Sequence, residues 1–333
     1  MSTAIIEHKE LSSPSPIKTG EYKKSSRLFF VQSKLLEAQI TDLFDDVWPT
    51  VTAWKNLRWQ VKGYHFEHPN YDNSQLTQRF VEANDKSNRP NLYRRCIQEP
   101  WEDQEYRIAS NLLLNTFACF EGWVDEILKI LGLHTKTRAT NFQFPSKWVN
   151  ELLTMQSGGN QVIVDAFFDA YKGASKRYNL GHLNNYYIAY RYFKECRNII
   201  VHSGGIVSNK LISAQKSYQS LSKEDLDVKE VPAFYAAQFD KPLSISLRGV
   251  VGFTQIVLNI VSTLDIEFIK CKNADSYFIN HLKSVLGGCP ITASSNPNKL
   301  KKDISHLCGK AGFKSPKEFT NMHVFLSRNG IML

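Results

Sequence analysis

Residues 105–131, EYRIASNLLLNTFACFEGWVDEILKIL, form the strongest helical pattern in the chain. At about 100° per residue, their apolar side chains cover two adjacent faces of a helix, and only a narrow strip carries Glu121, Asp125 and Lys129. A helix that is apolar over so wide an arc has to be covered on several sides. We therefore expect this helix to lie at the centre of the fold, and Gly132 predicts its C-terminal end.

Helical spacing of apolar residues also covers residues 25–62, where Pro49 interrupts the pattern and predicts two helices. Residues 63–100 are rich in Asn, His, Pro and Tyr and have no period, so we expect a long connector or a loop-rich insertion. Further helices are predicted at 146–156, 161–178, 183–202 and 250–270. Between them, 203–238 is polar without a clear pattern, and the alternation at 243–247 allows a short strand or an extended lead-in.

The two ends of the chain differ in composition from the rest. Residues 1–24 lack apolar periodicity and predict a flexible tail. Residues 281–333 carry eight Lys or Arg and two acidic residues, so they hold most of the net charge of +9. Helices are predicted there at 299–309 and 316–327, the second because Ser315-Pro316-Lys317-Glu318 reads as a capping box with Pro at the first helical position.

The patterns predict an all-α protein in four parts. These are the flexible tail at 1–24, an N-terminal helical extension with a loop-rich connector at 25–100, a helical domain at 101–275, and a small basic C-terminal helical appendage at 281–333. A chain of 333 residues with 42% hydrophobic content can bury a sizeable core. The net charge suits a polyanionic partner, although it would equally suit solubility alone.

The composition also gives an expectation for the cellular compartment of the protein. No uninterrupted apolar run reaches the length of a membrane span, so no membrane partner is expected, and the first residues are too polar for a secretory signal. Six widely spaced cysteines form no C-x-x-C pair and indicate buried free thiols in a reducing compartment. A cytoplasmic location is the default expectation.

The clearest candidate site lies in Arg197-Asn198-Ile199-Ile200-Val201-His202, at the end of the predicted helix 183–202 and before Ser203-Gly204-Gly205. RNA carries its own nucleophile, the ribose 2′-hydroxyl, so cleavage needs a group that moves a proton and a fixed positive charge. A His near its ordinary pKa can move the proton, and an Arg can stabilise the charge that develops on the phosphoryl oxygens. Asn198 and His202 are four residues apart on the face opposite the predicted core face, so Asn198 can orient the imidazole.

Each of these residues also has an ordinary structural explanation. A His in the last turn of a helix is favourable against the helix dipole, an Arg commonly forms a surface ion pair, and an Asn commonly lies solvated on a helix. Glu121 can face the same site from the central helix, but a solvated charge is its more common role. Arg191 and Lys194 precede the motif and could bind flanking phosphates, or simply extend along the surface.

Other chemistries find little support in the sequence. Gly309-Lys310-Ala311-Gly312-Phe313-Lys314-Ser315 is a near miss for a phosphate-binding loop, but Phe313 replaces the glycine before Lys-Ser and no apolar strand precedes it. His65 and His68 lack two further ligands and are more often surface residues than a metal site. We therefore expect no metal and no cofactor.

The R-N-x-x-x-H pattern at a helix end, within a helical domain, resembles the HEPN superfamily, whose members carry Arg and His separated by four to six residues. The resemblance covers about residues 100–275, and the helix with Phe117, Phe120, Glu121 and Trp123 looks like the helix that packs against the motif helix in such folds. It implies a HEPN-like helical bundle that pairs as a homodimer, with both motifs lining one cleft. HEPN ribonucleases cut single-stranded RNA without metal and leave a cyclic phosphate.

Carried over to this chain, the resemblance makes His202 the general acid or base, Arg197 the group that stabilises the transition state, and Asn198 a positioning residue. It also implies a toxin or antiviral-defence effector with an antitoxin or regulatory protein as partner. The alternative is a non-catalytic HEPN-like module that binds nucleic acid or acts as a scaffold in a larger complex, since some HEPN domains lack activity.

Overall fold

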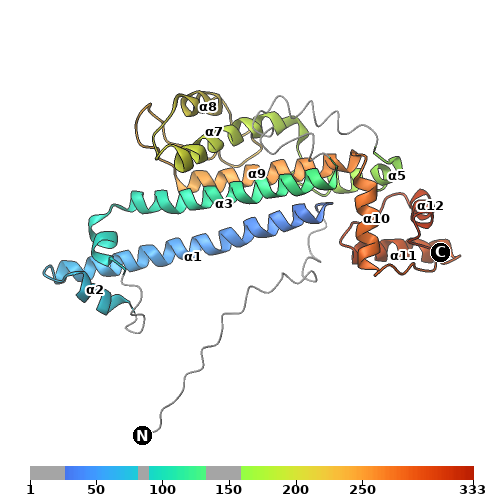
Figure 1. Ribbon diagram of the computed structural model, residues 1–333, viewed down its shortest axis with the longest axis horizontal. Helices are drawn as coiled ribbons and strands as arrows, with labels where there is room; N and C mark the ends of the chain where they lie inside the picture. The colour runs from blue at the N-terminus through green and yellow to red at the C-terminus, as the bar shows by residue number, and fades with distance from the viewer. Residues whose placement is uncertain (1–26, 82–89, 133–158) are drawn as a thin grey trace, which may run out of the picture.

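The computed structural model describes residues 27–81, 90–132 and 159–333, and these form an all-α fold. Two long helices, α1 (Val31–Glu67) and α3 (Trp101–Ile130), lie side by side and run in opposite directions (Figure 1). No strand occurs in the described ranges, which contain only two isolated β-bridges. The predicted tail at 1–24 and the predicted helix at 146–156 lie outside the described residues.

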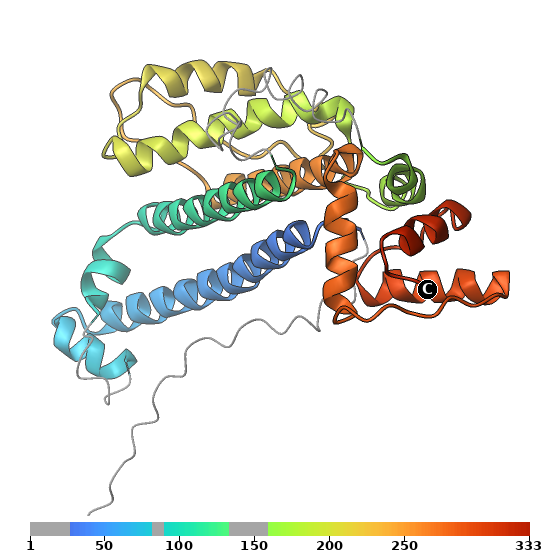
Figure 2. The same ribbon diagram turned by 45° about the vertical axis from the view of Figure 1, so that its right-hand side comes forward.

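Helix α3 is central, as its apolar arc predicts. It packs between α1 on one side and the helices α7 (Leu183–His202) and α9 (Leu247–Glu267) on the other (Figures 1 and 2). Aromatic rings connect the three inner helices, since the ring centroid of Phe117 lies 5.3 Å from that of Phe253 and 5.2 Å from that of Tyr190. Gly132, in the left-handed region with φ of 69°, follows the helix end as predicted.

The prediction that Pro49 divides residues 25–62 into two helices is wrong. Helix α1 continues through Pro49 to Glu67, although a proline inside a helix removes one backbone hydrogen bond. Both halves of α1 contribute buried side chains, with Leu36 and Ile40 before the proline and Val51 after it. Packing against α3 therefore holds together a helix that the local sequence alone would interrupt.

The loop-rich connector expected at 63–100 is also wrong for the part that is described. Helix α2 (Asn73–Phe80) begins with a capping box between Asp72 and Gln75, and the π-helical turn η2 (Tyr93–Gln98) follows. Four buried side chains close a second, small apolar cluster at this end of α1: Val61, Leu76, Leu92 and Cys96. The buried Arg58 donates to the carbonyls of Arg95 and Glu99, which fixes η2 against α1.

The helix predicted at 161–178 is shorter and irregular. A single turn α5 (Gln161–Ile163), a π-helical turn η4 (Val164–Phe168) and α6 (Asp169–Lys172) replace it, and the helical run stops before Gly173. The polar region 203–238 contains a helix that its weak pattern does not predict, α8 (Asn209–Gln219), which is capped by Ser208. The short strand considered at 243–247 does not form: residues 243–246 have no regular secondary structure and lead into α9, which begins at Leu247, with Ser246 extended as its N-cap.

The C-terminal region forms three helices, α10 (Ala274–Val285), α11 (Pro297–Lys310) and α12 (Thr320–Arg328), at one end of the bundle (Figure 2). The predicted capping box at 315–318 is wrong, because α12 begins only at Thr320 and has no side-chain cap. The backbone N–H of Lys317 instead donates to the carbonyl of Ala166, at 3.0 Å. Lys317 is therefore held by a long-range contact, and not by a local capping box.

The same apolar core runs from the start of α1 into the C-terminal region. The ring centroid of Phe313 lies 5.1 Å from that of Phe29 and 4.8 Å from that of Phe278. Lys34 of α1 donates to the carbonyl of Gly312 at 2.6 Å. Residues 281–333 therefore share their core with the main bundle.

Helix α9 with the following turn η6 (Phe268–Lys270) is the one helix in the described ranges that is long and apolar enough, by length and composition, to cross a membrane. In the fold, 83% of that window is buried inside the protein. Polar residues within the window, such as Asn259 and Asp265, are the reason that uninterrupted apolar runs did not reveal it. The apolar surface of α9 is used in packing against α3 and α7.

All six cysteines are unpaired. Four are buried, as expected, whereas Cys119 is half-buried and Cys289 is exposed.

Candidate functional site at the end of α7

The motif helix ends where its sequence predicts. Helix α7 spans Leu183–His202, and Gly204 and Gly205 adopt positive φ of 58° and 83° directly after it. The N–H of Gly205 donates to the carbonyl of Ile199 at 3.2 Å, six residues back, as in a Schellman cap. This arrangement places His202 in the last turn of a helix whose end is fixed.

The predicted core face of α7 is buried except at its last member. Ala189, Phe193 and Cys196 are buried, and the ring of Phe193 stacks on that of Phe253 at 4.4 Å. Ile200, which was expected on the same face, is only partly buried, whereas its neighbour Ile199 is buried in the core. The polar residues of the motif therefore lie at the edge of the packed bundle.

Arg197 is held on the side of α7 that faces α3. Its Nη2 lies 3.6 Å from a carboxylate oxygen of Glu121, and Lys194 lies 3.6 Å from the other oxygen of the same carboxylate. Burial lowers the pKa of Lys194, and the charge of Glu121 partly opposes that shift. Glu121 therefore contacts the catalytic candidate Arg197, and it also balances a cation that would be costly to bury alone.

Asn198 accepts a hydrogen bond from Arg197, with 3.2 Å between Nη1 and Oδ1. The sequence suggested that Asn198 orients His202, and the structure gives the amide oxygen a different partner. Arg197 and His202 are five residues apart, which is about 140° around a helix, so their side chains leave α7 in different directions. Asn198 lies between them and connects the side that faces α3 with the side that carries His202.

His202 is exposed and lines a cavity of about 570 Å³. Asn198 lines the same cavity from α7, Lys210 from the start of α8, and Phe239 from the segment before α9. The imidazole has no hydrogen-bond partner among the residues that the structure describes, so both ring nitrogens can reach a bound molecule. Arg197 does not line this cavity in a single chain.

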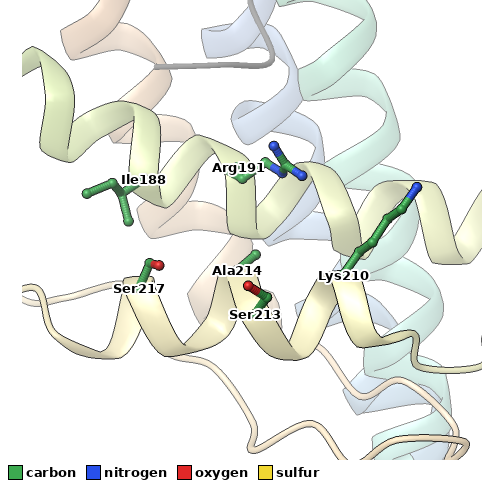
Figure 3. Close-up of a pocket in the computed structure, with 6 residues that line it drawn as sticks. All are labelled: Ile188, Arg191, Lys210, Ser213, Ala214 and Ser217. Carbon is green, nitrogen blue, oxygen red and sulfur yellow. The ribbon is translucent and has the colours of Figure 1, made fainter. Parts of the chain in front are cut away.

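The two weaker phosphate-binding candidates differ in their surroundings. The side chain of Lys194 is only 7% exposed and is directed at Glu121 and the ring of Tyr190, so it is not available to a phosphate in solution. Arg191 forms an ion pair with Glu195 at 2.9 Å and lines a second cavity of about 340 Å³ between α7 and α8 (Figure 3). Lys210 lines both cavities.

Sequence reasoning missed Lys210 and Phe239. Backbone hydrogen bonds bring them to the end of α7: the N–H of Val207 donates to the carbonyl of Lys241 at 2.9 Å, and the N–H of Asp240 donates to the carbonyl of Val207 at 3.1 Å. These contacts join segments more than 30 residues apart. The only local signal was Ser208, a favourable N-cap for the helix that carries Lys210.

The two histidines considered as metal ligands, His65 and His68, pack against tyrosine rings. His68 stacks on Tyr71 with ring centroids 5.0 Å apart, and His65 packs edge-on against Tyr93. Within the described ranges, no three His, Cys, Asp or Glu side chains gather as a metal site would require. The segment Gly309–Ser315 is the end of α11 and the turn that covers Lys34, without the strand and helix of a phosphate-binding loop.

Comparison of the chain with models of protein families, with curated proteins and with solved structures found no match.

Proposed function

We propose that this protein is a metal-independent endoribonuclease that cuts single-stranded RNA at the end of α7, in a HEPN-like domain at about 101–275. The observation that carries the proposal is the position of His202, exposed on the wall of a cavity at the fixed end of a helix. Arg197 supports it from the adjacent face, where it is bonded to Asn198, a residue of the same cavity.

The chemistry follows from groups that RNA and this chain contain. The 2′-oxygen attacks phosphorus and forms a new P–O bond, and His202 accepts the proton of the 2′-hydroxyl. The bond between phosphorus and the 5′-oxygen breaks, and that oxygen takes a proton from a protonated imidazole or from water. The products are a 2′,3′-cyclic phosphate and a 5′-hydroxyl. Arg197 stabilises the charge on the phosphoryl oxygens in the transition state.

The proposal includes a homodimer, as the HEPN resemblance implies. In one chain, Arg197 contacts Glu121 and Asn198 and does not line the cavity of His202. Pairing two copies at this end of α7 would bring a second motif to the same cleft. Val201 and Ile206, which are 47% and 41% exposed, flank His202 in the sequence and offer apolar surface for such pairing.

A non-catalytic role is the alternative, and one observation favours it. Glu121, Lys194 and Arg197 form an ion-pair cluster that would hold α7 against α3 even if no reaction occurred. In that case the domain would serve assembly or nucleic-acid binding. A role as a toxin or antiviral effector, with a protein inhibitor, rests on the resemblance alone.

The test compares the wild type with His202→Ala on total cellular RNA in EDTA, with new ends mapped by sequencing and checked for cyclic phosphate. We expect cuts by the wild type and a loss of about 10²- to 10⁴-fold in His202→Ala. His306→Ala, which changes an exposed histidine of α11, is the matched control and should cut normally. Unchanged cleavage by a folded His202→Ala protein would overturn the proposal.

A further inference from the structure

Two cavities lie along α7 and α8 near the candidate catalytic histidine, and we call the two together the α7–α8 groove. One, of about 570 Å³, contains His202, the other has about 340 Å³, and Lys210 lines both. In Figure 3, Ser213, Ala214 and Ser217 lie along α8 opposite Ile188 and Arg191 of α7, and Lys210 extends toward α7. Both cavities have volumes typical of ligand sites, about 300–1,000 Å³.

The α7 wall of this α7–α8 groove is one stripe of the helix. Arg191, Asn198 and His202 are separated by seven and four residues, and these spacings return to the same helical face. From Arg191 to His202 the stripe is about 16 Å long, at about 1.5 Å per residue. The lining residues therefore extend along α7 from His202 to Arg191, so an extended ligand bound at His202 can also contact Arg191.

Lys210 is the cation available to a ligand in the groove. Arg191 is already paired with Glu195, which also lines the groove. Lys210 is exposed and forms no ion pair with any residue that the structure describes. An ammonium group at the junction of two cavities can contact a phosphate in either of them.

Phe239 supplies a flat apolar surface beside His202. It is 61% exposed, which is unusual for a phenylalanine, and it lines the cavity of His202. The backbone hydrogen bonds of its neighbours Asp240 and Lys241 to Val207 hold the segment in place. Exposed aromatic rings beside a cation are how proteins bind unpaired bases, which stack on the ring.

We propose that the α7–α8 groove binds single-stranded RNA next to the scissile phosphate, with Lys210 contacting a backbone phosphate and Phe239 stacking on an unpaired base. The inference rests on the proposed ribonuclease function and assigns residues that the HEPN motif does not contain. Stacking requires a base that can leave its neighbours, so the groove selects single strands over duplex RNA.

The test measures binding, separately from cleavage, by fluorescence anisotropy of a short labelled single-stranded RNA of mixed sequence. Binding is measured in the full chain carrying His202→Ala, so that the RNA stays intact. Adding Phe239→Ala is expected to weaken binding about 5- to 150-fold, and Phe239→Tyr, which keeps a ring, to restore it. Adding Lys210→Gln is expected to reduce the slope of log affinity against log salt concentration by about 0.7, the value for one phosphate contact with a single strand.

Two matched controls separate the groove from general charge and apolar surface. Lys216→Gln removes an exposed lysine of α8 that lines neither cavity, and Phe66→Ala removes an aromatic ring that is 83% exposed on α1. Both should bind RNA like the parent protein. A duplex of the same composition should compete poorly with the single strand.

The outcomes distinguish this inference from the proposed function. Groove-dependent binding supports the inference even if the wild type cuts no RNA, in which case the ribonuclease proposal fails. If cleavage is metal-free and depends on His202 but the Lys210 and Phe239 variants bind RNA normally, the RNA-binding role of the groove is overturned. The proposed ribonuclease function then stands. Failure of the parent protein to bind the single strand, or equal competition by duplex, also overturns the RNA-binding role of the groove.

Discussion

Asp265 is a residue of α9 whose carboxylate lies in the core and binds the two residues that precede α1. It is fully buried, and its two oxygens accept the backbone N–H groups of Phe29 and Phe30 at 2.6 and 3.0 Å. Burial raises the pKa of Asp265 to about 6, although a hydrogen bond from Ser33, the two backbone N–H groups and the charge of Lys34 oppose the shift. One residue thus joins the segment directly before α1 to the central helix α9.

This raised pKa predicts a pH-dependent stability. A carboxyl with a folded pKa above its unfolded value of 3.8 contributes stability that is present below about pH 4 and lost as the pH rises through about 6. Asp265→Asn removes this titration. We therefore subtract the unfolding free energy of Asp265→Asn from that of the wild type. We expect the result to be higher at pH 4 than at pH 7, by on the order of 3 kcal/mol.

Urea unfolding at the two pH values measures that difference. Burial lowers the pKa of His281, but His281 is present in both proteins, so its contribution cancels in the comparison. Asp42→Asn, at an exposed position of α1, is the control and should show no such pH dependence. If the difference in unfolding free energy between the wild type and Asp265→Asn did not change with pH, the raised pKa of Asp265 would be contradicted.

At the scale of the element, α1 is the helix in which local preference and packing conflict. Pro49 interrupts the backbone hydrogen bonds of α1, yet the helix continues for another 18 residues to Glu67. Pro49 is exposed, so its ring contributes little to the core. The side chains packed on α3 compensate for the weakness of the helix at this position.

Replacing the proline should therefore stabilise the protein. Pro49→Ala restores a backbone donor and removes the clash of the ring with the preceding turn, so we expect the free energy of unfolding to rise by about 1–3 kcal/mol. Denaturant unfolding monitored by circular dichroism measures the change. Thr50→Ala, at the adjacent exposed position, should have a much smaller effect, and an unchanged or lower stability in Pro49→Ala would show that the proline is needed for the native shape of α1.

At the scale of the whole molecule, the C-terminal region completes the core. The ring of Phe313 lies among those of Phe29, Phe167 and Phe278 and is 3% exposed. Phe313→Ala is expected to destabilise the whole protein by about 3–5 kcal/mol, because a large cavity would open between the bundle and the C-terminal helices.

Thermal or urea unfolding followed by tryptophan fluorescence checks this, since the six tryptophans all precede the C-terminal region. The control is Val324→Ala on the outer side of α12, where the side chain is 43% exposed and the expected loss is small. If Phe313→Ala left the main unfolding transition unchanged, residues 281–333 would be an independent unit.

The proposed pairing of two chains is also a property of the whole molecule. Val201→Asp places a charge on apolar surface beside His202, so we expect it to weaken the dimer at least about tenfold and to reduce cleavage per chain in parallel. Light scattering and cleavage rates over a range of protein concentrations measure both effects. A wild-type chain that is monomeric and fully active on dilution would exclude a composite site.

The sequence by itself determined the all-α class, the C-terminal end of α3, the extent of α7, and the stop at Ser203-Gly204-Gly205. These features depend on apolar periodicity and on glycines that accept positive φ, and both are local properties of the chain. The position of His202 at the end of a helix was predictable for the same reason. The chemical role of the motif remains a proposal.

Only the tertiary structure decided which partners these residues have. Long-range contacts decided four features: the continuity of α1 through Pro49, the hydrogen bonds of Asp265 to the two residues before α1, the ion pairs of Glu121, and the position of Phe239 beside His202. Such contacts depend on how helices pack in three dimensions, and no short-range pattern encodes them. Local spacing therefore predicted which residues lie at the end of α7, whereas packing determined that Arg197 faces α3 and His202 faces the groove.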